Sequence, residues 1–187
     1  MMTRSKNKGS VSWDCIIIGA GLAGLSCGIQ TASAGLKTLI ISGGMSALHF
    51  ASGSIDLLGY DPRGKNIIHP RKHMAELLER KPLHPYKKVG INTVIEALLW
   101  FRDTLSAQGV DLFNHGDENH LHMTALGTLK PTFLSGVTSY NEKLREAFLR
   151  HDTVALLTFR GYRDYYPELA AARLANSPTW KSKIITG

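Results

Sequence analysis

The feature that most constrains the fold is a group of glycines set between two short apolar stretches. The first stretch, residues 13–18, is apolar and β-branched and stops at Gly19. Residues 22–34 carry small side chains on one helical face and end at Gly35, and a second apolar stretch follows at residues 36–41. Two strands joined through a helix of this length pair in parallel, with the helix as the crossover. The pattern therefore predicts a β-α-β unit whose strands are buried in a parallel sheet, the first strand on both faces.

The glycines have the spacing G-x-G-x-x-G, and their place between a predicted strand and a predicted helix makes the motif specific. The first glycine permits a tight turn, the second lets a phosphate approach the backbone, and the third lets the helix lie close to the sheet. Free N–H groups and the positive end of the helix dipole would face that phosphate. The alternative is a purely structural glycine turn. The predicted phosphate-binding residues are Gly19, Ala20, Gly21, Leu22, Ala23 and Gly24.

The fold class predicted from this unit is α/β, with a Rossmann-type FAD/NAD(P)-binding flavoprotein fold that is incomplete at the C-terminus. An Asp or Glu usually ends the second strand of such a unit and binds the adenosine ribose. Here Ser42 stands in that place, followed by Gly43. A serine offers one hydrogen bond rather than a charged bidentate contact, so a mononucleotide flavin, which has no adenosine ribose, fits as well as a dinucleotide held by a neighbouring backbone group.

The segment after the second predicted strand, residues 46–58, combines small, hydroxylated and aromatic residues. Small residues would let a flat isoalloxazine ring pass, with Ser52, Gly53 and Ser54 as predicted cofactor contacts. His49 is a candidate proton acceptor, although no catalytic residue is identified. A well-packed loop with a satisfied histidine is the alternative.

Four regions are predicted along the chain. Residues 1–12 are expected to form a disordered basic leader, 13–58 the nucleotide-binding unit, 59–150 an inserted helical and hairpin region, and 151–187 the start of a further, truncated α/β segment. Further helices are expected near residues 70–80 and at residues 141–150. Another is expected to begin at a capping box formed by Thr93 and Glu96 and to end at Gly109. A last one is expected to run from a cap formed by Asp164 with Pro167 to Ala175. Strands are expected within 121–134 with a turn at Gly127, at 153–159 and from Lys183.

The net charge of +7 is spread in pairs without an aromatic-interleaved stripe, so nucleic acid is not an expected partner. Cys15 and Cys27 are interpreted as small buried residues of a protein in a reducing compartment, and two cysteines are too few for an iron–sulfur or zinc site. A metal site is conceivable where His115, His120 and His122 surround Asp117 and Glu118. A solvated hairpin tip explains the same residues, and no metal is predicted.

Several stretches resemble one family, the B subunit of the bacterial anaerobic glycerol-3-phosphate dehydrogenase. They are residues 19–25 (GAGLAGL), 46–58 (SALHFASGSIDLL), 84–86 (HPY) and 126–132 (LGTLKPT). The resemblance implies a flavoprotein subunit that carries FMN, with FAD as the alternative cofactor. It also implies oxidation of glycerol 3-phosphate, a small phosphorylated substrate, to dihydroxyacetone phosphate, with electrons passed to quinone.

The resemblance further implies a sister FAD-containing catalytic subunit and an iron–sulfur subunit that anchors the complex to the membrane. The chain itself would then be cytoplasmic and peripheral to the inner membrane through that partner. Family members are roughly twice as long as this chain, which would make it a fragment whose activity alone is open. The other hypotheses are an FAD-dependent oxidoreductase of the fumarate-reductase type and a non-catalytic fragment or assembly scaffold.

Overall fold

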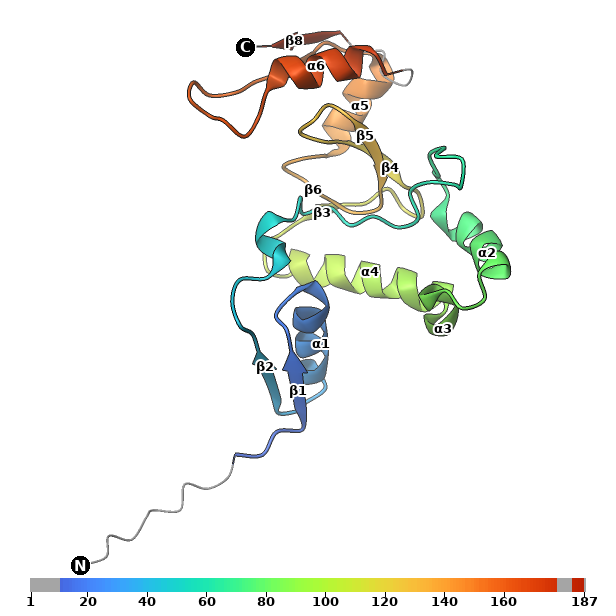
Figure 1. Ribbon diagram of the computed structural model, residues 1–187, viewed down its shortest axis with the longest axis vertical. Helices are drawn as coiled ribbons and strands as arrows, with labels where there is room; N and C mark the ends of the chain where they lie inside the picture. Colours follow the sequence, from blue (N-terminus) through green and yellow to red (C-terminus); the bar gives the residue numbers. More distant parts are fainter. Residues whose placement is uncertain (1–10, 178–182, 187) are drawn as a thin grey trace, which may run out of the picture. The chain divides into compact units, whose positions relative to one another are not determined.

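The computed structural model describes residues 11–177 and 183–186 (Figure 1). By its contacts the chain divides into two compact units, Met1–Ser52 and Gly53–Gly187. The boundary falls before the turn-rich stretch that follows Leu58 in the sequence. Most of the leader predicted at residues 1–12 lies outside the described residues.

The first unit is the predicted β-α-β unit. It contains β1 (Cys15–Ile18), α1 (Leu22–Ser33) and β2 (Thr38–Ile41), followed by the short 3₁₀ helix η1 (Ala47–Phe50). The two strands are parallel and in register from Cys15 opposite Thr38 to Ile18 opposite Ile41. Gly35 has a φ of 82°, which allows the chain to leave α1 and enter β2, as predicted from its position.

Burial in this unit differs from the sequence-based prediction. Ile16 and Ile18 are 56% and 88% exposed, whereas α1 covers the opposite face of the sheet (Figure 1). The prediction that the first strand is buried on both faces is therefore wrong for the described chain, because one helix can cover only one face of a two-stranded sheet. Cys27 is exposed and Cys15 half-buried, so the interpretation of both cysteines as buried residues is also wrong.

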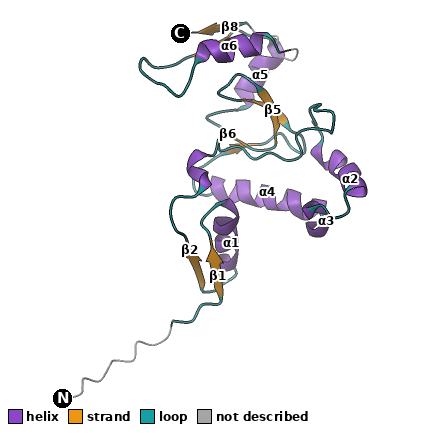
Figure 2. Cartoon of the chain, viewed as in Figure 1, coloured by secondary structure: helices purple, strands orange, loops and turns teal. Residues whose placement is uncertain are grey.

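The second unit contains helices of different lengths and short strands joined by loops (Figure 2). Its helices are α2 (Pro70–Arg80), α3 (Pro85–Val89), α4 (Ile91–Ser106), α5 (Glu142–Arg150) and α6 (Pro167–Ala175). Its strands are β3 (Leu112–Phe113), β4 (His120–Met123), β5 (Leu129–Thr132), β6 (Ser135–Gly136), β7 (Val154–Leu156) and β8 (Ile184–Thr186).

Several predicted elements of the second unit are confirmed. The antiparallel pair β4 and β5 turns at Gly127, and α5 begins with the Asn141 side chain capping the amide of Leu144. Strands β7 and β8 are parallel with α6 between them in sequence, a second β-α-β connection. β7 is shorter than predicted and ends at Leu156.

Two predicted helix starts are wrong. α4 begins at Ile91 after Gly90, whose φ of 92° lets the chain reverse directly out of α3, so Thr93 lies inside the helix and cannot form the predicted capping box with Glu96. The N-cap of α6 is Tyr166 rather than Asp164, although Pro167 does occupy the first helical position.

Two hydrophobic clusters stabilise the second unit. One joins Leu57, Met74 of α2, Ile95 of α4, Phe133 and Leu134. The other joins Leu156 of β7 with Ala170 and Leu174 of α6. Met123 and Leu129, which are paired across the β4–β5 hairpin, pack against this second cluster.

Candidate functional site

The glycine turn has the geometry that its sequence predicts. Gly19 follows β1 with a φ of 107°, a conformation that side chains other than glycine rarely adopt. Its amide donates a hydrogen bond of 2.8 Å to the carbonyl of Ile41, the last residue of β2. The ends of both strands and the start of α1 therefore meet at this turn.

Gly24 brings α1 close to the sheet. A Cβ atom at Gly24 would lie 1.9 Å from the carbonyl oxygen of Gly19 and 3.4 Å from Cγ2 of Ile17. At Gly28, one turn later, a Cβ would lie 2.6 Å from Cδ1 of Ile40. The first contact is with backbone that cannot move aside, so the turn requires glycine at position 24.

The space outside the turn is open. A Cβ at Gly21 would meet no atom within 4 Å. Gly21 is the N-cap of α1, where no side chain caps the helix and the first turn has no acidic residue. Within residues 11–177 and 183–186, no acceptor binds the amides of Leu22, Ala23 and Gly24. Exposed amides at a helix N-terminus attract an anionic group, so the arrangement fits the phosphate of a nucleotide cofactor.

Ser42 lies directly after β2. It is next to the glycine turn because the amide of Gly19 is hydrogen-bonded to the carbonyl of Ile41, the residue before Ser42. Its side chain is exposed, and Oγ donates a hydrogen bond of 2.9 Å to the carbonyl of Gly44. A Cβ at Gly43 would meet no atom within 4 Å. The serine hydroxyl is thus held by a local turn and supplies no charged contact.

The segment after β2 is divided between the two units. The hydroxyl of Ser46 accepts a hydrogen bond from the amide of Leu48 at the start of η1, and His49 is exposed with its ring edge-on to Phe50 at 4.9 Å. Ser52 ends the first unit, whereas Gly53 and Ser54 belong to the second. Among the predicted cofactor contacts, the structure brings residues 19–24 together with Ser42 and Gly43.

A charged cluster lies at Ser54 in the second unit, and sequence reasoning missed it. The Lys130 ammonium of β5 lies 2.9 Å from Oγ of Ser54 and 3.0 and 2.9 Å from the two carboxylate oxygens of Asp56. The hydroxyl of Thr132 donates to the same carboxylate at 2.9 Å. The segment 53–56 and β5 are far apart in sequence, so the pattern of apolar and polar residues along the chain does not predict their contact. Both, however, lie in the stretches that carry the family resemblance.

A pair of buried histidines is the second feature that sequence reasoning misread. Nε2 of His120 and Nδ1 of His122 lie 2.7 and 2.9 Å from Oγ of Ser135, and both histidines are only 5% exposed. The interpretation of these residues as a solvated hairpin tip is wrong, because Tyr140 stacks on His120 and Phe113 packs edge-on against it. In the described part of the chain, no group of three His, Cys, Asp or Glu side chains could hold a metal ion.

Burial shifts the titration of this cluster. Burial lowers the pKa of His120 to about 4, and the charges of His122 and His115 contribute less to this shift. Burial and the charge of Lys130 also lower the pKa of His122. Burial also raises the pKa of Tyr140 to about 12. The histidines are therefore neutral at pH 7.

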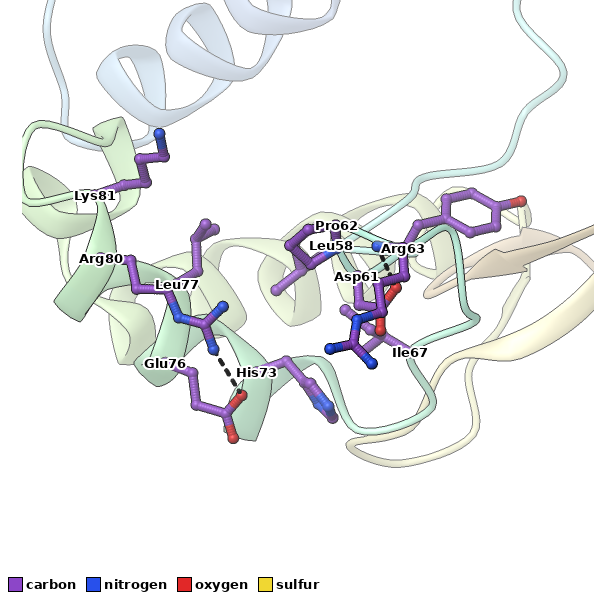
Figure 3. Close-up of a pocket in the computed structure, with 11 residues that line it drawn as sticks. Leu58, Asp61, Pro62, Arg63, Ile67, His73, Glu76, Leu77, Arg80 and Lys81 are labelled. Atoms are coloured by element: carbon purple, nitrogen blue, oxygen red, sulfur yellow. Dashed lines mark hydrogen bonds and ion pairs between the residues drawn. The ribbon is translucent and has the colours of Figure 1, made fainter.

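A cleft of about 540 Å³ lies between the turn at residues 58–63 and helix α2 (Figure 3). Leu58, Ile67 and Leu77 contribute apolar surface, and Arg80 on its wall pairs with Glu76 at 4.0 Å. None of the predicted cofactor contacts lines this cleft.

Known proteins similar to the chain are longer than it is. The B subunit of anaerobic glycerol-3-phosphate dehydrogenase from Aliivibrio fischeri is 42% identical over 88% of this chain and 36% of its own length. The proteins of the same name from Vibrio vulnificus and Mannheimia succiniciproducens are 41% and 36% identical, over 91% and 94% of this chain and 39% and 41% of their own lengths. The chain therefore spans about two fifths of these relatives.

No solved structure matches the chain. The described helices include none with the length and apolar character needed to cross a membrane. The family model for the FAD binding domain matches residues 14–186, from the start of β1 to the end of β8. With its β-α-β unit and glycine turn, this α/β chain belongs to the FAD-binding domain family and is a flavin-binding protein.

Proposed function

We propose that the chain is part of a flavoprotein subunit of an anaerobic glycerol-3-phosphate dehydrogenase, which oxidises glycerol 3-phosphate to dihydroxyacetone phosphate. The observation that carries the proposal is the likeness of nearly the whole chain to relatives of that name, together with a glycine turn whose amides are open to a phosphate. A bound flavin would supply the hydride acceptor for the substrate C–H bond.

The residues of the first unit would bind and orient that flavin. The amides of residues 22–24 and the dipole of α1 hold its phosphate, and Gly21 leaves room for the phosphate to approach. Gly24 and Gly28 keep α1 against the sheet, which fixes where those amides point. Ser52 would line the ring of the flavin, with His49 as a candidate proton acceptor.

We propose FMN as the cofactor. The argument is that no acidic residue occurs between Ile41 and Asp56, and that the hydroxyl of Ser42 is bonded to Gly44. A dinucleotide would lack the charged contact to its adenosine ribose. The name of the family model favours FAD, so the two cofactors are the two outcomes of a direct test.

The proposed partners are a sister FAD-containing catalytic subunit and an iron–sulfur subunit that holds the complex at the inner membrane. The support is that the relatives are named as subunits of a dehydrogenase. Electrons would leave this chain's flavin for those partners and reach quinone. The chain would then be a cytoplasmic component attached to the membrane only through its complex.

The cofactor is tested by releasing the flavin from the purified chain with heat and separating FMN from FAD by chromatography. The expected product is FMN. The variant Gly24→Ala should purify with little flavin, because its Cβ would meet the Gly19 carbonyl. Gly44→Ala is the matched control, since a Cβ there meets no atom within 4 Å and should leave the flavin in place.

FAD as the released product would overturn the FMN assignment and favour an oxidoreductase of the fumarate-reductase type. A chain that cannot be loaded with either flavin would favour a non-catalytic scaffold. The reaction itself is tested by dye reduction that depends on glycerol 3-phosphate, measured with the chain assembled with its partner subunits.

A further inference from the structure

Helix α2 has one face in the core and another face on the cleft of about 540 Å³. Met74 and Leu78 are buried, and Met74 belongs to the first hydrophobic cluster. Four residues at three- and four-residue steps along α2 line the cleft, namely His73, Glu76, Leu77 and Arg80. The core therefore fixes the helix that forms one wall of the cleft.

The opposite wall, which includes Leu58 and Ile67, is held by hydrogen bonds. The amide of Ile67 donates to the carbonyl of Gly59 at 2.8 Å. Nδ2 of Asn119, a residue only 3% exposed, donates to the carbonyls of Leu58 and Ile67 at 3.4 and 2.9 Å. This network keeps Leu58 at a φ of 40°, a conformation that costs a residue other than glycine free energy. Because both walls are fixed, the cleft exists before a ligand binds.

Arg63 places a free cation on this second wall. Oδ1 of Asp61 accepts hydrogen bonds from the amides of Arg63 and Lys65, both at 2.8 Å, so this carboxylate holds the backbone of the turn. In the described part of the chain, no ion pair or hydrogen bond engages the Arg63 guanidinium itself. Figure 3 shows its side chain pointing into the space between the turn and α2. A guanidinium in this position can bind an anionic group through two N–H donors.

His73 offers a ring nitrogen to the same space from α2. Its Nδ1 lies 3.0 Å from the carbonyl oxygen of His69, so Nδ1 carries the hydrogen, because a carbonyl oxygen only accepts. The ring points into the cleft (Figure 3), and Nε2 bonds to none of the described residues. Nε2 can accept a hydrogen bond from a ligand hydroxyl, or donate one when the ring is protonated.

The rest of the lining is apolar or already paired. Arg80 pairs with Glu76 at 4.0 Å. Apolar surface comes from Leu58, Ile67 and Leu77. The volume lies within the range of about 300–1,000 Å³ that is typical of small-molecule sites, and it exceeds what an inorganic anion fills. The lining therefore fits a molecule with an anionic head and an apolar body.

We propose that this cleft binds a small organic anion, whose phosphate or carboxylate head is held by Arg63 and His73 and whose body contacts the apolar side chains. The cleft lies wholly within the second unit. The proposal needs no bound flavin, so it goes beyond the proposed function.

The test is titration calorimetry of the chain at fixed ionic strength with four probes: phenyl phosphate, benzoate, inorganic phosphate and phenol. Phenyl phosphate or benzoate should bind at least tenfold more tightly than inorganic phosphate and phenol, because each of the last two has only one of the two required parts. The tighter of the two aromatic anions identifies the head that the cleft prefers.

Arg63→Met should weaken binding of the preferred aromatic anion about tenfold, the effect of losing one charge-assisted hydrogen bond. His73→Leu should also weaken it. Lys81→Met is the matched control, since it removes the same charge from a lining residue whose ammonium points away from the cleft (Figure 3). This control should keep the affinity of the wild type, and all three variants should keep its midpoint of thermal unfolding.

Three results would overturn the proposal. One is a wild-type chain that binds neither aromatic anion. Another is equal affinity for inorganic phosphate and phenyl phosphate, and the third is an equal loss of affinity in Lys81→Met and Arg63→Met, since both would show a general attraction of anions to a basic chain. None of these results bears on flavin release or on dye reduction with glycerol 3-phosphate, so the proposed function stands or falls separately.

Discussion

The hydroxyl group of Ser135 determines the hydrogen bonding of the two buried histidines beside it. Its oxygen lies within hydrogen-bond distance of both His120 and His122, so it can donate to one ring and must accept from the other. Both rings are neutral in this arrangement, and Tyr140 excludes water from one side of His120. A proton added to either ring would be buried, and the Asp56 carboxylate, whose charge acts on both rings, is already paired with Lys130.

The stability of the chain should therefore depend on pH. The pKa of His120 is lowered to about 4 and that of His122 is also lowered, so below about pH 6.5 the unfolded chain binds protons that the folded chain does not. The free energy of unfolding should fall as the pH drops from about 6.5 towards 4, by up to about 1.4 kcal/mol per pH unit for each histidine. Urea unfolding at several pH values measures this slope.

His120→Gln should flatten this pH dependence, while His73→Gln, at a half-buried histidine of α2, serves as the control. An equal slope in wild type and His120→Gln would contradict the assignment of the effect to the buried pair.

The β4–β5 hairpin shows how one element is fixed by its turn. Gly127 has a φ of 73°, and a Cβ there would lie 2.2 Å from the carbonyl oxygen of Ala170 in α6. The turn thus touches the backbone of α6 directly. The sequence identifies Gly127 as a turn residue, but the contact with α6 is a tertiary one that the local pattern does not contain.

Gly127→Ala should destabilise the chain by about 2 kcal/mol more than Gly116→Ala, because overpacking against a backbone atom adds to the strain of a positive φ. Gly116 is the matched control, since its φ is also positive, at 58°, and a Cβ there meets no atom within 4 Å. Denaturant unfolding of both variants gives the comparison. Equal losses would mean that α6 does not pack against the turn in solution.

At the scale of the whole molecule, the chain exposes apolar surface that a compact flavoprotein would cover. Among the described residues, α1 covers one face of the β1–β2 sheet, and Ile16 and Ile18 are exposed on the other. The curated relatives are more than twice as long as the chain. An uncovered apolar sheet face with unpaired edges favours self-association.

The isolated chain should therefore form oligomers at micromolar concentrations, and the double variant with Ile16→Thr and Ile18→Thr should form fewer. Analytical ultracentrifugation measures the shift towards the 20.5 kDa monomer. Val11→Thr, an exposed apolar residue before β1, should leave the distribution unchanged. A wild-type chain that sediments as a monomer at all concentrations would contradict the prediction.

The sequence by itself determined the β-α-β unit, its glycine turn and most of the later helices and strands, because each depends on side-chain periods and backbone freedom within a few residues. The starts of α4 and α6 differ from the sequence-based prediction. Gly90 and Tyr166 precede these helices, and neither start has a capping side chain. Only the tertiary structure joined Lys130 to Asp56 and buried His120 beside Ser135. Such contacts depend on which distant faces pack together, and spacing along the chain does not encode that choice.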